Sequence, residues 1–189
     1  MLNKLFKEFL TLSSQLRPEY LVSLGKETNN WMKELSHIDN DTPELYKAIY
    51  GTVSGTKRSI KEQSLMDFIP GYRLIHIQEL LQEKEKIENI LGTDSLEGEK
   101  VFPILTNYSS DYVCNYRDQW GTEKICSLFH DDGTLIVMNN SPKRFLETIC
   151  EFYKKKVYFL DQDGYLDYDM EKEAYLGSIF NPGVEYWLD

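Results

Sequence analysis

The chain has 189 residues and a formal net charge of -10 at pH 7, with 41% hydrophobic and 13% aromatic residues. This composition excludes a disordered chain, and the length allows a buried core without disulfides or a structural metal. The negative charge repels polyanions, so we expect no direct binding to nucleic acid and instead expect a basic protein partner.

The first forty residues carry a helical pattern. Apolar residues between Leu2 and Leu16 recur at helical spacing, and Pro18 is placed to open a second helix that continues to Leu35. Lys4 and Lys7 interrupt the apolar run, so it does not read as a signal peptide. We therefore expect a helical N-terminal extension over residues 1–40, joined to a main domain over residues 41–189 in one compact unit.

A third helix is predicted from Pro43 to Gly51, with Thr42 as its N-cap. Residues 52–66 have no periodicity and are interpreted as a loop. Ile69-Pro70-Gly71-Tyr72 is typical of a turn, because proline presets one turn dihedral and glycine supplies the other. A short strand and a helix ending at Gly92 are expected to follow.

From Val101 the pattern changes to strands. Asp132-Gly133 predicts a hairpin, and the apolar run 134–138 after it predicts a central strand covered on both faces. Ser141-Pro142 then opens an amphipathic helix. The expected fold class is α+β, with a mixed, mainly antiparallel sheet flanked by helices.

A last strand pair is predicted around Asp163-Gly164, before a small helix and an aromatic tail. The carboxylates of residues 161–169 resemble a calcium loop, but Tyr165 and Leu166 stand where that loop needs a ligand and a glycine. An acidic turn is the better interpretation, and we expect no metal there.

His130, Asp131 and Asp132 contain the residue types of a metal or acid-base site, yet the Asp-Gly pair favours a hairpin tip. The three cysteines form no CxxC pair and lie on apolar segments, which predicts buried thiols in a reducing compartment. No run reaches membrane-spanning length, so a cytoplasmic protein without membrane contact is expected. With no hydrolase, phosphate-loop or dinucleotide motif, we predict a non-enzyme without cofactors, and a hydrolase using His130 stays an alternative.

An ordered series of short motifs resembles the SUKH superfamily of bacterial immunity proteins and yeast cell-wall regulators. The series comprises Pro43-Glu44-Leu45-Tyr46-Lys47, Ile69-Pro70-Gly71-Tyr72, Phe102-Pro103-Ile104, Asp111-Tyr112-Val113-Cys114, Asp132-Gly133 and Ser141-Pro142-Lys143-Arg144-Phe145-Leu146-Glu147. It covers roughly residues 41–164, whereas the first forty residues have no clear counterpart in the family. Asn107-Tyr108-Ser109-Ser110 also departs from the glycine-rich approach that the family often has before its Asp-Tyr element.

The resemblance implies an immunity protein that binds and neutralises a cognate polymorphic toxin, here a nuclease-like one with a basic surface. Inhibition would be steric and electrostatic. The alternative is a non-catalytic interaction or regulatory scaffold of the same superfamily. Because binding residues usually lie on turns and loops, the expected contacts are Asp111, Tyr112, Asp131, Asp132, Asp163 and Tyr165.

Overall fold

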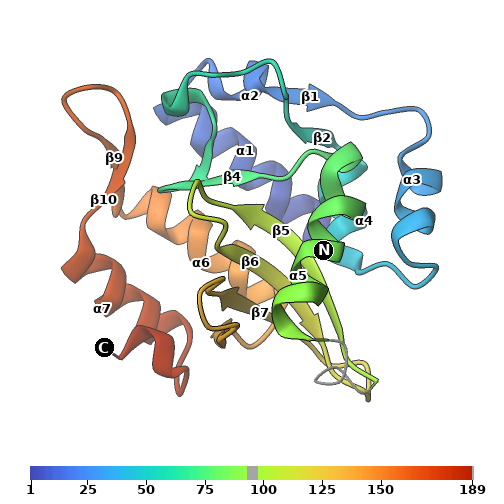
Figure 1. Cartoon of the computed structure of the whole chain (residues 1–189). Coiled ribbons are helices and arrows are strands. Elements are labelled where there is room, and N and C mark those ends of the chain that lie inside the picture. The colour runs from blue at the N-terminus through green and yellow to red at the C-terminus, as the bar shows by residue number, and fades with distance from the viewer. Residues whose placement is uncertain (93–97, 189) are drawn as a thin grey trace.

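Figure 1 shows the protein as a computed structural model that describes residues 1–92 and 98–188. The helices are α1 (Leu2–Leu16), α2 (Tyr20–Ser23), α3 (Trp31–Ile38), α4 (Glu44–Tyr50), α5 (Leu80–Leu91), α6 (Pro142–Lys154) and α7 (Met170–Phe180), with the 3-10 turns η1 (Gln63–Leu65), η2 (Ile77–Glu79) and η4 (Glu185–Trp187). The strands are β1 (Leu24–Lys26), β2 (Val53–Thr56), β3 (Asp67–Ile69), β4 (Tyr72–Leu74), β5 (Lys100–Thr106), β6 (Tyr112–Arg117), β7 (Glu123–Leu128), β8 (Leu135–Asn139), β9 (Tyr158–Leu160) and β10 (Leu166–Tyr168). No helix in the described ranges is long and apolar enough to cross a membrane.

The main sheet has the order β3-β4-β5-β6-β7-β8, and every pairing in it is antiparallel. The α+β prediction is therefore confirmed, although the described strands form no parallel pair. Antiparallel neighbours place the turns of the β3–β4, β5–β6 and β7–β8 hairpins at one end of the sheet, which we call the hairpin end. Gly71 and Gly133 have φ values of 77° and 67° in two of these turns, a conformation that glycine adopts without strain.

Helices α1 and α6 pack against each other behind the sheet in Figure 1, and α5 lies in front of it. The Ser141 hydroxyl accepts a hydrogen bond from the Arg144 amide at 3.2 Å, which caps α6 as the sequence predicts. The Phe9 ring of α1 stacks on the Phe68 ring of β3 with centroids 4.1 Å apart, and Phe68 stacks in turn on Phe145 of α6. Residues 1–40 thus share the hydrophobic core of the rest of the chain.

Three expectations in the first part of the chain are wrong. The predicted second helix is broken into α2 and α3 by β1, which pairs with β2 inside the segment interpreted as a loop. Gly25 lies opposite Gly55, and a Cβ atom on Gly25 would lie 1.9 Å from the Ser54 hydroxyl, so close backbone contact replaces helical packing. The third helix begins at Glu44 with Pro43 at the N-cap, and Thr42 does not cap it.

The β8 prediction is also wrong, because β8 is an edge strand of the main sheet. Its apolar character has another cause, since the C-terminal turn η4 packs beside it. The Trp187 indole N–H donates a hydrogen bond of 2.6 Å to the Met138 carbonyl, which satisfies an acceptor of the exposed strand edge. The strand with the most continuous burial is β5.

We predict that Phe9→Ala lowers the free energy of unfolding by about 3–5 kcal/mol, because it opens a cavity inside the aromatic stack. Val22→Ala is the control, since Val22 is exposed on α2 and its truncation should change stability by no more than about 0.5 kcal/mol. Urea unfolding of both variants measures the difference. Equal losses in the two variants would contradict the assignment of α1 to the core.

Candidate functional site

A cluster of polar side chains joins two loops at the hairpin end. Asp111 Oδ1 accepts hydrogen bonds from the His130 amide at 3.1 Å and lies 3.0 Å from the His130 ring Nδ1. Asn107 Nδ2 donates to Asp111 Oδ2 at 3.0 Å, and Asn107 Oδ1 accepts from the Asp111 amide at 2.8 Å. The loop between β5 and β6 is therefore fastened to the loop between β7 and β8.

The charges in this cluster support one another. The hydrogen bond to Asp111 raises the pKa of His130, and the nearby Asp131 carboxylate acts in the same direction. Partial burial acts to raise the pKa of Asp111, but the hydrogen bonds from His130 and Asn107 hold it below its usual value. Asp131 lies 2.9 Å from the second ring nitrogen of His130 and is otherwise exposed, whereas Asp132 accepts from the Thr134 amide at 2.8 Å.

This arrangement is better explained as a link between two hairpins than as a catalytic or metal centre. The imidazole is held between two carboxylates, and the described residues contain no group of three or more His, Cys, Asp or Glu side chains placed to hold a metal ion. The cysteines are free and buried, and burial raises the pKa of Cys126 and of Cys150 to about 12. Such thiols are protonated at neutral pH, which disfavours nucleophilic chemistry.

Tyr112 does not belong to the surface that the sequence predicts. Its side chain is 1% exposed, and its hydroxyl donates a hydrogen bond of 2.7 Å to Glu83 of α5. The first four residues of β6 are all buried, so both faces of the strand are covered at its start, and Tyr112 packs inside the protein beside the more exposed Asp111. Tyr112 acts as a core contact between the sheet and α5.

The remaining predicted residues, Asp163 and Tyr165, lie on the β9–β10 hairpin, which projects from the left of Figure 1. Asp161 Oδ1 accepts from the amides of Asp163 and Tyr165 at 2.9 and 2.8 Å, so this carboxylate closes the turn. The Asp163 side chain is exposed, and Tyr165 is 41% exposed. These contacts agree with an acidic turn rather than a calcium loop.

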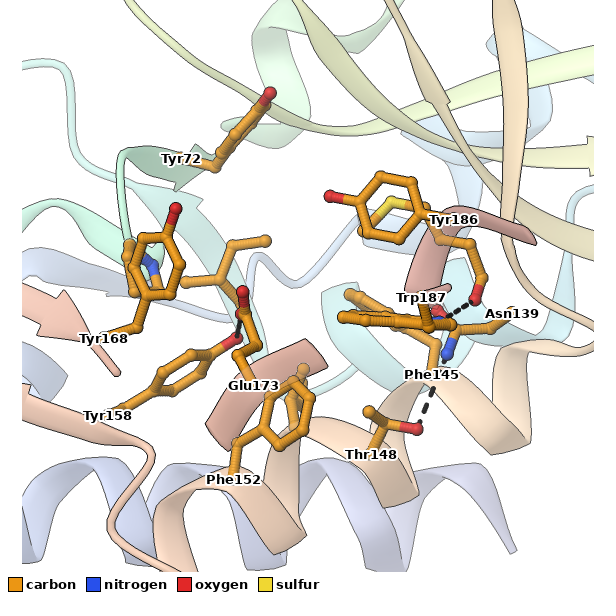
Figure 2. A pocket seen from close by; sticks show the side chains of 14 residues that line it. Tyr72, Asn139, Phe145, Thr148, Phe152, Tyr158, Tyr168, Glu173, Tyr186 and Trp187 are labelled. Atoms are coloured by element: carbon orange, nitrogen blue, oxygen red, sulfur yellow. Dashed lines mark hydrogen bonds between the residues drawn. The ribbon is translucent and has the colours of Figure 1, made fainter. Parts of the chain in front are cut away.

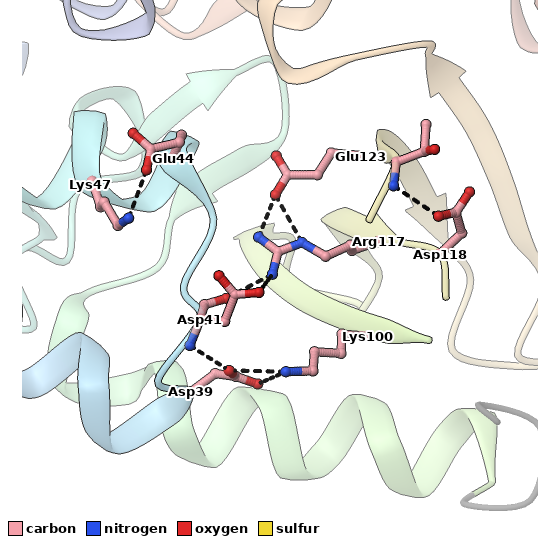
Figure 3. A network of polar contacts seen from close by, with 9 residues as sticks. Asp39, Asp41, Glu44, Lys47, Lys100, Arg117, Asp118 and Glu123 are labelled. Atoms are coloured by element: carbon pink, nitrogen blue, oxygen red, sulfur yellow. Dashed lines mark hydrogen bonds and ion pairs between the residues drawn. The ribbon is translucent and has the colours of Figure 1, made fainter. Parts of the chain in front are cut away.

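The segment 158–188 carries seven carboxylates and one lysine, and we call it the acidic segment. None of these seven carboxylates forms an ion pair with a residue in the described ranges. At the end of the main sheet opposite the hairpin end, carboxylates are paired with cations. Figure 3 shows that Lys100 pairs with Asp39 and Arg117 pairs with Asp41, each at 2.8 Å. Unpaired negative charge is thus concentrated at the C-terminal side of the protein.

The acidic segment also exposes large apolar side chains. Tyr175 is 66% exposed on α7, and Met170 and Ile179 of the same helix are exposed with it. The further exposed apolar residues of this segment are Phe159, Leu160, Tyr165, Tyr186 and Leu188. Aromatic anchors ringed by charged groups are the usual composition of a protein-binding surface.

A pocket with a cavity of about 100 Å³ lies beside the hairpin end, since Pro70 and Tyr72 of the β3–β4 hairpin line it. Figure 2 shows the side chains of its wall. Its wall includes Ile69 of β3 and Met138 of β8, so the two edges of the main sheet meet around it. Glu173 of α7 faces this space, and its Oε1 lies 3.5 Å from the Tyr158 hydroxyl. Burial raises the pKa of Glu173 to about 7.

Sequence reasoning misses this pocket because its residues come from eight separate elements. One signal was present, since five of the thirteen tyrosines lie within the acidic segment. The hairpin signals, by contrast, place Asp111, Asp131 and Asp132 together at the hairpin end. Comparison of the chain with protein-family models and with curated proteins finds no match.

We predict that the pKa of His130 lies above the value of about 6.5 typical of histidine, and that Asp111→Asn lowers the pKa of His130. Folding raises the proton affinity of His130, so this tether stabilises the fold fully below pH about 6.5 and is lost as pH rises through the raised pKa. Asp132→Asn removes an equal charge from the turn of the β7–β8 hairpin, and it should leave the pKa of His130 nearly as high as in the unmodified protein. An NMR pH titration measures all three proteins, and equal effects of both substitutions would contradict the tether.

Proposed function

We propose that this protein is an immunity protein that binds a cognate protein toxin and blocks its active surface. One observation carries the proposal: the acidic segment combines unpaired carboxylates with exposed aromatic side chains on one side of a rigid sheet. Such a surface is complementary to a basic protein patch, and complementary charge raises association rates and rejects wrong partners. The resemblance of the motif series to the SUKH superfamily supports the same proposal.

A nuclease-like toxin is the proposed target, because an enzyme that binds polyanions presents basic residues around its active site. Carboxylates such as Asp163 and Asp167 occupy the contacts that phosphates would use, while Tyr165 and Tyr175 provide the buried centre of the interface. The protein then excludes substrate without any chemistry of its own. Protection of the producing cell places this action in the cytoplasm.

Co-expression with a candidate toxin domain, sought in the neighbouring gene, tests the proposal. We expect cells that express the toxin domain to survive only when this protein is present, and the two purified proteins to form a stable complex. A complex without rescue would favour the regulatory scaffold, the alternative member of the same superfamily. Death of the cells despite abundant folded protein, with no complex in vitro, would overturn the proposal.

Charge reversal locates the surface. Asp163→Lys should lower the association rate constant about tenfold at low ionic strength, because it replaces attraction by repulsion at the contact. Glu27→Lys is the matched control, since Glu27 is also exposed but directly follows β1 in the connection to α3. Figure 1 shows α3 on the opposite side of the protein from the β9–β10 hairpin. Stopped-flow mixing with the toxin domain measures both rates, and a larger effect of Glu27→Lys would move the binding surface elsewhere.

A further inference from the structure

The pocket behind the acidic segment has the composition of a receptor for one cationic side chain. None of its 14 lining residues is lysine, arginine or histidine, and its wall contains four tyrosines together with Glu173. In Figure 2, Tyr158 and Tyr168 lie on one side of the Glu173 carboxyl group, and Tyr186 and Trp187 lie on the other. A carboxylate among aromatic faces attracts a cation both by charge and by the ring quadrupoles.

Two acceptor groups of the pocket are weakly paired or unpaired. Glu173 forms no ion pair within the described residues, and the one hydrogen bond that its side chain accepts there comes from the Tyr158 hydroxyl at 3.5 Å, the outer limit of a hydrogen bond. Asn139 also lines the pocket, and its buried Oδ1 has no hydrogen-bond partner in the part of the chain that the structure describes. The nearest lysine along the chain, Lys172, directs its ammonium group toward the Lys156 carbonyl at 3.5 Å.

The size of the cavity selects the kind of occupant. Pockets for drug-sized ligands measure about 300–1,000 Å³, whereas this cavity of about 100 Å³ suits the end of one long side chain. A guanidinium group is planar, weakly hydrated and able to stack on aromatic rings while it binds a carboxylate, which an ammonium group does less well. Arginine therefore fits these walls better than lysine.

We propose that this pocket receives an arginine side chain of the protein partner, with its guanidinium group between the tyrosine rings and against the Glu173 carboxylate. The proposal rests on the proposed function for the source of the arginine. It adds a specific anchor to the diffuse charge of the acidic segment, since a buried side chain in a pocket is the usual centre of an interface.

The test uses the full chain and three probes: acetyl-arginine methylamide, its lysine counterpart, and the uncharged citrulline counterpart. In an NMR titration, the arginine probe should give saturable shifts of the Trp187 and Tyr186 signals at a dissociation constant of about 1–10 mM. The lysine probe should bind more weakly and the citrulline probe at least tenfold more weakly. Equal binding of citrulline, or tighter binding of lysine, would overturn the proposal.

Two glutamates of α7 provide a matched pair of variants. Glu173→Gln should weaken the arginine probe at least tenfold, whereas Glu171→Gln removes the same charge from the same first helical turn at an exposed position and should change little. Glutamine keeps the shape of Glu173, and this carboxyl group is already partly protonated near pH 7, so the variant should fold. Equal effects of the two substitutions would mean that the overall negative charge of the protein attracts the probe and that the pocket does not, which would contradict the proposal.

The pH dependence of the affinity for the arginine probe provides a further test that needs no variant. Affinity for the arginine probe should rise between pH 6 and pH 8, because Glu173 ionises through this range and only its charged form attracts the cation. The facing groups do not titrate there, since burial raises the pKa values of Tyr72, Tyr158, Tyr168 and Tyr186. A pH-independent affinity would contradict the role of Glu173.

The probe experiments need no toxin, so the arginine pocket and the immunity function can be tested independently of each other. If the arginine probe binds in a Glu173-dependent manner but no toxin is neutralised, the pocket stands and the immunity function falls. If the toxin is neutralised and the arginine probe does not bind, the immunity function stands and the pocket is not an arginine site.

Discussion

The curl of the main sheet is the constraint on which the rest of the structure depends. Its two edge strands, β3 and β8, come close enough to line one pocket, and the space inside the curl is filled by α6 and by the aromatic stack on Phe68. A curled sheet leaves two edges with unpaired backbone groups, which must be paired or covered. Here the C-terminal segment covers the β8 edge, where the Trp187 indole N–H donates a hydrogen bond to the Met138 carbonyl.

This closure explains why the candidate binding surface lies where it does. The segment that covers the sheet edges is also the one that carries the unpaired carboxylates and exposed tyrosines, so its position is held by core packing rather than by its own charges. Gly177 of α7 packs directly against the Trp187 ring, which leaves no room for a side chain and holds the helix against η4. The charged groups are therefore presented on a rigid support, which lowers the entropy lost on binding.

Local signals in the sequence predict much of the fold. The Asp132-Gly133 turn, the Ser141 cap and the Asp163-Gly164 hairpin are found as expected, because each depends on backbone preferences of adjacent residues. The failures need long-range contacts: β1 forms only by pairing with β2, and β8 is apolar because η4 covers it. The pocket around Glu173 could not be predicted for the same reason, since strands, helices and turns distant in sequence build it.

The central claim is that the acidic segment meets the partner. Hydrogen exchange of the protein, free and in complex with its proposed toxin partner, tests this claim without altering a residue. The account predicts slower exchange in β9, β10, α7 and η4 and in the loop 107–111, with little change in α3 and α4. Protection confined to α3 and α4, with the acidic segment unchanged, would contradict it.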